Sequence, residues 1–308
     1  MKKHYKSFLA VLSLAFLLVG CTGQQPNTPV NPGDDTHQGG DAPGGDTPGG
    51  GDTPGGGDTP GGGDTPGGDT GDYYSEVKDL SGDALLQGLR SLNSKKRTKT
   101  VGYGNMGTSA SGQFKYTDYD PDGTVLYDSN GQPYGTTIIS FYSGNKMTSF
   151  NREHVWPNTH GGNLVENDIH MPRPTIPSEN GSRGHSFYVE GVISNRNEGW
   201  DPAMESFGVE SYRGDSARII FYCMVASNQL TLTDDASRSS LTKNKEMGVI
   251  SDMLKWNLNY PVLDREQRRN SGAEYLQGNR NPFIDHPEYA CKIWGSYNSK
   301  TKQICGIN

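Results

Sequence analysis

Residues 149–163 read SFNREHVWPNTHGGN. Neighbouring side chains of a regular β-strand point to opposite faces, so Glu153 and His154 cannot serve one surface unless the backbone is irregular. Charged side chains around a Val-Trp pair also make a poor buried strand, because such groups are seldom buried without partners. Pro157, Gly161 and Gly162 predict that irregularity directly after the strand. The stretch therefore indicates either an exposed edge strand or a functional site.

Polar and basic side chains stay dense beyond this stretch. Residues 151–188 contain four histidines and three arginines. Chemistry on a phosphodiester needs a base, a cation at the leaving oxygen and positive donors on the other phosphate oxygens. Histidine, oxygen ligands for Mg²⁺ and arginine supply these three. A zinc hydrolase motif of the form HxxEH would need a histidine at position 150, which is Phe150, so zinc hydrolysis is excluded.

The N-terminus predicts an export signal. Three lysines precede an apolar run over residues 8–19, which is shorter than the ~20 residues that cross a bilayer. The run ends in Leu-Val-Gly-Cys, which resembles a bacterial lipobox and implies lipidation of Cys21 with removal of residues 1–20. An ordinary signal peptide with a chance cysteine is the alternative. We expect an exported lipoprotein of the outer membrane, held through Cys21.

A low-complexity segment follows. Residues 22–72 contain 18 of the 42 glycines, nine aspartates, no lysine or arginine, and a repeated GGGDTP unit. Such a segment cannot offset its ordering entropy, so we expect a disordered tether over residues 21–72 and a folded domain over residues 73–308. This domain has 26 acidic and 25 basic side chains. Its near-neutral balance excludes a broad basic surface, so contact with a polyanion needs a local basic cluster or a metal ion.

The order of the expected elements indicates an α+β fold. Residues 81–93 carry Leu85, Leu89 and Leu92 on one helical face, with Ser81 as the N-cap. Residues 112–150 alternate short aromatic and β-branched runs with Asp-Gly and Asn-Gly turns, which is typical of hairpins. Helical patterns return over residues 214–229, 245–259 and 263–277. Strands that precede a run of helices favour α+β over a βαβ arrangement.

Three cysteines remain in the folded part. In an oxidising compartment Cys291 and Cys305 are expected to pair and close a short C-terminal loop. Cys223 lies in an apolar helical run and is expected to be a buried free thiol.

An Arg-Gly-Asp tripeptide, which some adhesion ligands display, occupies residues 213–215. It comes directly before an apolar helix. We therefore interpret Gly214 and Asp215 as the N-terminal cap of that helix, with Arg213 and Arg218 on its polar side.

Five motifs follow one another in the folded part. They are FNREHVWP at 150–157, DIH-x-x-RPT at 168–175, EN-x-S-R-G at 179–184, RGD-x-AR-x-x-FY at 213–222 and QGNRNPFIDHPE at 277–288. Together they resemble the bacterial endonuclease I family of secreted nucleases, over about residues 73–288. The resemblance implies a ββα-metal (His-Me finger) core with additional helices and short hairpins. It also implies a monomeric, metal-dependent, sequence-nonspecific endonuclease that cuts DNA, and RNA as a further substrate, to leave 5′-phosphate ends.

The resemblance also implies roles for single residues. It makes His154 the general base, Glu153 a metal ligand and Asn180 the second protein ligand. Two protein ligands completed by waters suit Mg²⁺, with Ca²⁺ and Mn²⁺ as alternatives.

The chain departs from the family pattern in two places. No transition-state arginine aligns, so Arg183 and Arg173 are the candidates for that role. His185 stands where members often carry Asn. Support of the site through hydrogen bonds is expected from Asp168, His170 and His185, whereas His160 is expected to be exposed to solvent.

A catalytically degenerate surface protein that binds or adheres is the alternative reading of the chain. Loss of any one of Glu153, His154 and Asn180 would have favoured this reading. The sequence retains all three, which favours the enzyme.

Overall fold

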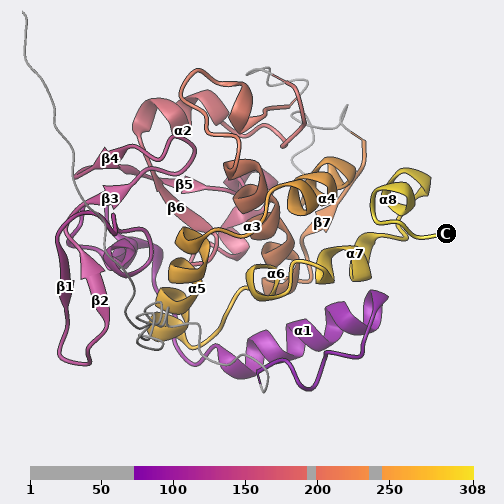
Figure 1. The fold of residues 1–308 in the computed structure, drawn as a ribbon, viewed down its shortest axis with the longest axis horizontal. Helices are drawn as coiled ribbons and strands as arrows, with labels where there is room; N and C mark the ends of the chain where they lie inside the picture. The colour runs from indigo at the N-terminus through magenta and orange to yellow at the C-terminus, as the bar shows by residue number, and fades with distance from the viewer. Residues whose placement is uncertain (1–72, 193–198, 236–244) are drawn as a thin grey trace, which may run out of the picture. The chain divides into compact units, whose positions relative to one another are not determined.

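The computed structural model describes residues 73–192, 199–235 and 245–308. Within these ranges β1 to β4, within residues 125–147, lie on the left of the view and most of the helices toward the right, and this mixture of helices and short strand pairs is the predicted α+β class (Figure 1). The expected signal, the lipidated Cys21 and the tether lie outside the described residues. Within the described residues, no helix combines the length and the apolar character needed to span a membrane.

The described strands form two-stranded sheets. Three pairs are antiparallel: β1 (Val125–Tyr127) with β2 (Pro133–Gly135), β3 (Ile138–Ile139) with β4 (Lys146–Met147), and β5 (Asn151–His154) with β6 (Pro172–Thr175). The first pair is a hairpin closed by the predicted Asn-Gly turn at 130–131, whereas the connection of the second pair contains Ser143-Gly144, and the Asp-Gly pair at 122–123 lies before β1. A fourth pair, β7 (Thr231–Leu232) with β8 (Glu246–Met247), is parallel.

The helices of the described ranges fill the rest of the fold. The α-helices are α1 (Gly82–Lys96), α2 (Pro177–Arg183), α3 (Tyr212–Ala226), α4 (Ile250–Asn259), α5 (Asp264–Gln277), α6 (Pro282–Asp285), α7 (Tyr289–Trp294) and α8 (Ser299–Ile304). Short 3₁₀ helices cover Tyr103–Met106, Gln113–Tyr116, Asn158–His160, Gly162–Leu164 and Pro202–Met204. The prediction of one helix over residues 245–259 was wrong in its first turn, because Glu246 and Met247 pair with β7 before α4 begins.

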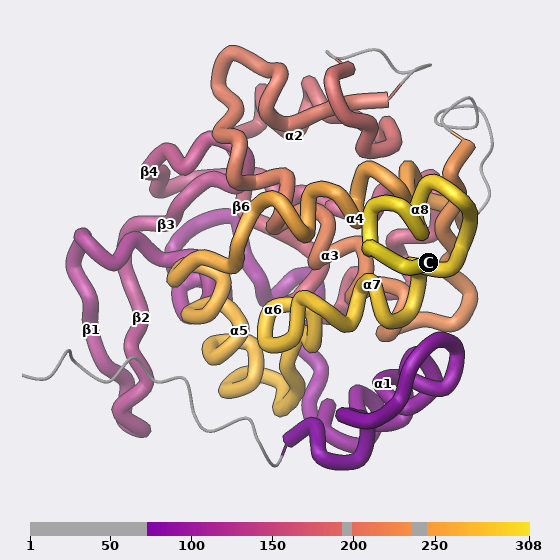
Figure 2. The backbone as a smooth tube through the Cα atoms, turned by 45° about the vertical axis from the view of Figure 1, so that its right-hand side comes forward, coloured from indigo at the N-terminus to yellow at the C-terminus, as the bar shows by residue number. Residues whose placement is uncertain are grey.

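Helix α3 is the centre of the helical part. It packs against α1, α4 and α6, and Figure 2 shows these elements around it. Residues 212–225 are buried on every side of α3, so the expected polar face does not exist. The helix also begins at Tyr212, before the residues that we interpreted as its cap. The Arg-Gly-Asp tripeptide is therefore buried and is not displayed to a receptor.

The charges of α3 are tolerated because each has a buried or half-buried partner. The ion pairs are Arg213–Asp201 at 2.6 Å, Arg218–Glu266 at 2.6 Å and Asp215–Arg265 at 2.8 Å.

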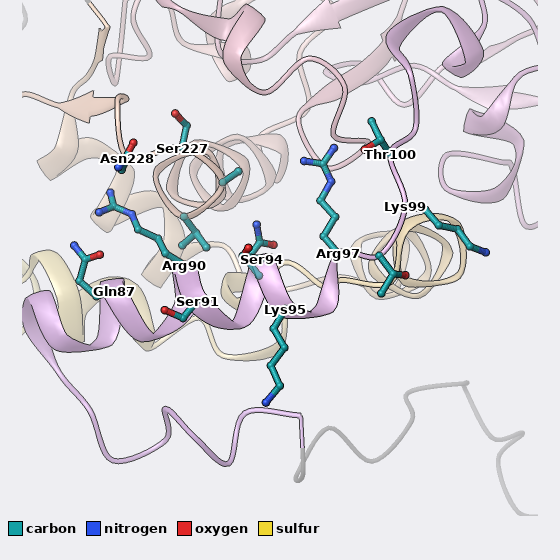
Figure 3. A pocket seen from close by; sticks show the side chains of 14 residues that line it. Gln87, Arg90, Ser91, Ser94, Lys95, Arg97, Lys99, Thr100, Ser227 and Asn228 are labelled. Carbon is teal, nitrogen blue, oxygen red and sulfur yellow. The ribbon is translucent and has the colours of Figure 1, made fainter.

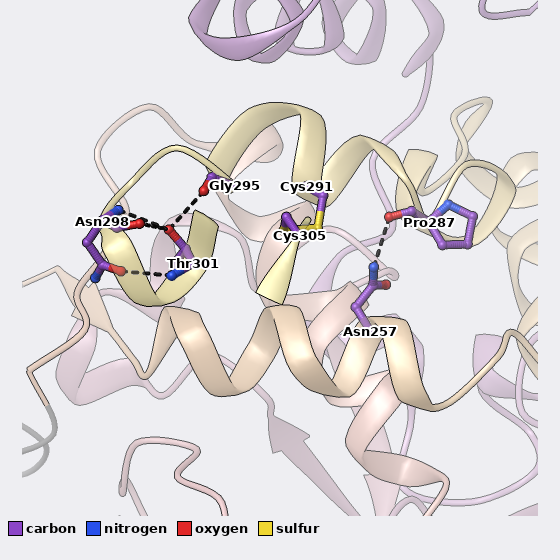
Figure 4. The surroundings of a disulfide bond; sticks show 7 residues. All are labelled: Asn257, Pro287, Cys291, Gly295, Asn298, Thr301 and Cys305. Atoms are coloured by element: carbon purple, nitrogen blue, oxygen red, sulfur yellow. Dashed lines mark hydrogen bonds between the residues drawn. A yellow bond between two sulfur atoms is a disulfide. The ribbon is translucent and has the colours of Figure 1, made fainter. Parts of the chain in front are cut away.

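The C-terminal helices are held by a disulfide. Cys291 of α7 and Cys305, directly after α8, are bonded, and their Cα atoms lie 5.6 Å apart (Figure 4). This is the pairing that we expected from the sequence. Cys223 is a buried free thiol, as also expected, and burial raises its pKa well above the usual value.

Strands β5 and β6 and helix α2 make the expected ββα unit. The register places Glu153 opposite Arg173 and His154 opposite Pro172. Only Ile176 separates β6 from α2, and Pro177 occupies the first turn of α2, where its missing N–H costs nothing. The short connection makes α2 cross next to β5, with which it is in contact.

Candidate active site

A cavity of about 210 Å³ brings the three expected site residues together. Glu153 and His154 reach it from β5, and Asn180 reaches it from α2. Strand β5 ends at His154, so the alternation of a regular strand stops there and two neighbouring side chains line one space. The remaining lining residues are Arg152, Pro157, Asn158, Thr159, Gly184 and His185.

Glu153 is a buried carboxylate with only 1% of its surface exposed. Its Oε1 accepts a hydrogen bond from the Tyr142 hydroxyl at 2.9 Å, and Nε of Arg183 lies 3.7 Å away. Burial raises the pKa of Glu153 to about 7, although Arg183 and Tyr142 act in the opposite direction. A cation in the cavity would favour the charged carboxylate, since nearby positive charge offsets the cost of burial.

His154 is held on both ring nitrogens, with 14% of its side chain exposed. Nε2 lies 3.3 Å from a carboxylate oxygen of Glu166, and Nδ1 lies 3.4 Å from the Tyr103 hydroxyl. The Tyr103 ring also lies under the guanidinium of Arg152, 4.0 Å from its centroid. Burial lowers the pKa of His154, and Glu166 opposes that change. The imidazole is therefore neutral near pH 7, the state that a general base needs.

Asn180 is half-buried in the middle of α2. Its backbone closes the helix, but its side-chain amide has no hydrogen-bond partner among the described residues. An amide oxygen of this kind is a hard ligand, and Mg²⁺ and Ca²⁺ prefer such oxygens.

The structure does not place Arg183 where a phosphate clamp is needed. Arg183 is fully buried and donates to the carbonyl of Val155 at 2.8 Å and to that of His154 at 3.3 Å. A guanidinium without exposed surface cannot contact a substrate in this arrangement. Arg183 instead fixes the end of β5 to α2.

Arg173 is likewise buried, and this differs from the role expected for it. It donates to Asp118 at 2.9 Å and covers the Phe141 ring. It does not line the cavity that contains His154. Its guanidinium holds β6 to the segment before β1.

Two of the three expected supporting residues lie in a network of their own. The Asp168 carboxylate accepts from the Tyr222 hydroxyl at 2.6 Å and from the Gln277 amide at 2.7 Å. His170 Nε2 donates to the Asn279 carbonyl at 3.1 Å. This network ties the segment before β6 to α3 and to the end of α5, so it supports the site from a distance.

His185 lines the cavity itself, and its carbonyl accepts a hydrogen bond from His160 Nε2 at 3.1 Å. The expectation that His160 is exposed was wrong, because only 1% of its surface is accessible. The loop folds back under Trp156, whose indole N–H donates to the His160 carbonyl.

Sequence reasoning missed Glu166, Tyr142 and Tyr103. Glu166 and Tyr103 bind the ring of His154, and Tyr142 binds Glu153. These three residues stand outside the five motifs quoted above. These residues are separated along the chain from the residues they bind, so the sequence does not indicate the contacts. The contacts form only in the folded structure, where the loops lie over β5.

Comparisons of the sequence with known proteins identify its family. The endonuclease I family model matches residues 84–288. The chain belongs to the endonuclease I family. The extracellular ribonuclease of Bacillus amyloliquefaciens is 34% identical over 249 residues, 73% of this chain and 79% of the relative. The extracellular ribonuclease of Bacillus subtilis (strain 168) is 31% identical with the same coverage. Membership of the endonuclease I family makes this chain an endonuclease.

Proposed function

We propose that the chain hydrolyses phosphodiester bonds of both DNA and RNA, without sequence preference, in the cavity between β5 and α2. The observation that carries this proposal is the meeting of Glu153, His154 and Asn180 in one cavity of about 210 Å³. RNA is included because two relatives are named extracellular ribonucleases. DNA is included because no ribose hydroxyl takes part in the chemistry proposed here.

His154 is the proposed general base. Glu166 accepts the hydrogen bond of the Nε2 proton, so Nδ1 carries the lone pair that takes a proton from the attacking water. The Tyr103 hydroxyl, 3.4 Å from Nδ1, leaves this lone pair free when it donates to the Arg152 carbonyl, which lies at the same distance. The lowered pKa of His154 keeps this lone pair available near pH 7. Hydrolysis through water, with departure of the 3′-oxygen, yields 5′-phosphate and 3′-hydroxyl ends.

Glu153 and Asn180 are the proposed ligands of a divalent cation, Mg²⁺ in the first place and Ca²⁺ or Mn²⁺ as alternatives. The two residues fit such an ion, since one offers a buried carboxylate with a raised pKa and the other an amide without a partner among the described residues. No group of three His, Cys, Asp or Glu side chains suited to a metal occurs in the described part, so waters would complete the coordination. A bound cation supplies positive charge at the departing oxygen.

End-group analysis of digested DNA and RNA, with and without EDTA, tests this function. We expect both polymers to be cut only when divalent metal is present, and both to carry new 5′-phosphates. Cyclic 2′,3′-phosphates from RNA, with DNA left intact in Mg²⁺, would show that a different chemistry operates.

We further propose that the enzyme is exported and held in the outer membrane by lipid on Cys21, with residues 21–72 as a tether for the nuclease domain at 73–308. The lipobox-like Leu-Val-Gly-Cys and the extracellular relatives support this. Cys21→Ser should block lipidation and release the protein or leave it unprocessed. A Ser variant that is processed and sediments with membranes like the wild type would contradict lipidation.

A further inference from the structure

A second cavity of the described part is larger than the one that contains His154. It measures about 960 Å³ and lies between α1 and the end of α3 (Figure 3). Its lining contains no Asp, no Glu and no aromatic side chain. The lining residues are Gln87, Arg90, Ser91, Asn93, Ser94, Lys95, Arg97, Thr98, Lys99, Thr100, Val225, Ala226, Ser227 and Asn228. We call this cavity the α1 groove.

Two guanidinium groups extend into the α1 groove. Figure 3 shows Arg90 projecting from α1 toward Asn228, and Arg97, the residue directly after α1, projecting on the same side toward Thr100, whereas Lys95 points the other way. Lys95 also pairs with Glu76 at 2.6 Å, so its charge already has a partner.

Both arginines are held in place, and Arg90 keeps free donors. Arg90 donates from Nε to the Met224 carbonyl at 3.0 Å, and no acceptor for its terminal nitrogens occurs in the described part. Arg97 donates to the Asn167 carbonyl at 2.6 Å, has Asp168 at 3.5 Å from Nη1 and buries its Nε, so it anchors the wall of the groove. The folded domain has nearly equal numbers of acidic and basic residues, and Asp168 offsets the charge of Arg97. Arg90 has no ion pair in the described part, so in a groove without a carboxylate in its lining it is a local excess of positive charge.

The α1 groove is connected to the catalytic cavity by two short routes along the chain. Asn167, which binds Arg97, is the neighbour of Glu166, and Glu166 contacts the His154 ring. On the other side Thr100 of the groove precedes Tyr103, which also contacts that ring. Three residues of chain span at most about 11 Å. A strand that leaves the catalytic cavity can therefore reach the groove.

We propose that the α1 groove is a subsite for the phosphate backbone of the nucleic acid strand on one side of the scissile bond. The inference rests on the nuclease function proposed above. Arg90 offers its terminal nitrogens from α1, and Arg97, the residue directly after α1, is bound to Asn167 on the side of the catalytic cavity. The absence of aromatic side chains from its lining excludes stacking with bases there. Contacts to phosphate and sugar carry no sequence information, so the subsite fits an enzyme without sequence preference.

The test uses the full chain and two single-stranded DNA substrates, a tetranucleotide and a strand of about 20 nucleotides. Only the longer strand can occupy both the cavity and the groove. Arg90→Gln should lower kcat/KM on the long strand about tenfold and leave the tetranucleotide rate unchanged. It should also lessen the salt dependence of binding by about 0.7 in the slope of log K against log salt, one phosphate contact of a single strand. Arg90→Lys, which keeps the charge, should retain most of that slope.

Arg268→Gln is the matched control. Arg268 is a half-buried arginine on α5 that lines neither cavity. The control variant loses the same charge. It should leave kcat/KM on both substrates and the slope of log K against log salt unchanged. Thermal unfolding should show that each variant is folded. If Arg90→Gln does not fold, Arg97→Gln tests the groove at a second position.

Equal loss on both substrates, no loss on the long strand, or the same loss in Arg268→Gln would overturn the subsite and leave the nuclease function standing. Wild-type protein that cleaves neither substrate in Mg²⁺ would overturn the proposed function and the subsite together.

Discussion

At the scale of single residues, Glu166 explains how a histidine at the end of a strand is kept in one orientation. Its carboxylate lies 3.3 Å from Nε2 of His154, on the opposite side of the ring from Tyr103. A base that donates one N–H to a carboxylate is fixed in its tautomer, so the other nitrogen carries the lone pair that the reaction needs.

Replacement of Glu166 by Gln should therefore lower kcat by roughly 10- to 100-fold, the usual cost of losing such a partner, with KM nearly unchanged. Tyr103→Phe should cost less, because the tyrosine carries no charge. Steady-state kinetics on a fluorescent oligonucleotide measure both variants. A Glu166→Gln enzyme with wild-type kcat would remove Glu166 from the site.

Single substitutions can also distinguish the proposed metal ligands from the other residues that line the cavity. Glu153→Ala and Asn180→Ala should raise the Mg²⁺ concentration for half-maximal activity, and activity should partly recover at high Mg²⁺. Thr159→Ala, which lines the same cavity, should leave the metal requirement unchanged. Metal titrations that are identical for wild type and Glu153→Ala would exclude Glu153 as a ligand.

At the scale of elements, the site depends on how α2 is held against β5. Arg183 of α2 donates to two carbonyls at the end of β5 and lies beside Glu153. The two elements that contribute His154 and Asn180 are therefore joined by one buried guanidinium. Because this guanidinium is buried, we interpret it as a link between α2 and β5 and not as a contact with substrate.

Arg183→Ala should accordingly lower the free energy of unfolding by about 3–5 kcal/mol, because it leaves the buried Glu153 without its cation and two carbonyls without donors. Arg268→Ala, at a half-buried position of α5, should change stability by less than about 1 kcal/mol. Urea denaturation measures both. If Arg183→Ala keeps wild-type stability and loses only turnover, the clamp role that the sequence suggested is restored.

The sequence predicted α1, α3, α5 and the disulfide because each has a local signal in apolar spacing or cysteine position, whereas the ββα unit was expected from the resemblance to the family. It could not predict the parallel pairing of β7 with β8, since two residues per strand carry no periodicity. It misassigned Arg183, Arg173 and His160 for a related reason. The sequence does not show whether a polar side chain will find a hydrogen-bond partner inside the folded protein. Each of these three residues has such a partner and is buried with it.

At the scale of the whole domain, a buried histidine couples stability to pH. His170 is enclosed by α3 and the chain after α5, where its Nε2 donates to Asn279 and its ring lies against Tyr222. Burial lowers the pKa of His170 to about 4, and the neighbouring Asp168 opposes this change. A histidine in the unfolded chain titrates near 6.5. Between these pH values the unfolded state binds the additional proton, so acidification favours unfolding.

The free energy of unfolding should fall by on the order of 2 kcal/mol between pH 7 and pH 4.5 through His170 alone. His170→Gln keeps a donor for Asn279 but does not titrate, so it should lack this part of the decrease. Urea denaturation at the two pH values, with the difference between variant and wild type as the readout, isolates the contribution. An equal decrease in both proteins would contradict it.

The central claim is that the cavity shared by Glu153, His154 and Asn180 performs the hydrolysis, with His154 as its base. Single-turnover cleavage of DNA in Mg²⁺ by His154→Ala, with substrate affinity and thermal unfolding measured on the same preparation, tests this most directly. We predict a loss of roughly 10²- to 10⁴-fold in the cleavage rate, with affinity and unfolding temperature as in the wild type. A variant that binds DNA, stays folded and cleaves within tenfold of the wild-type rate would contradict the account.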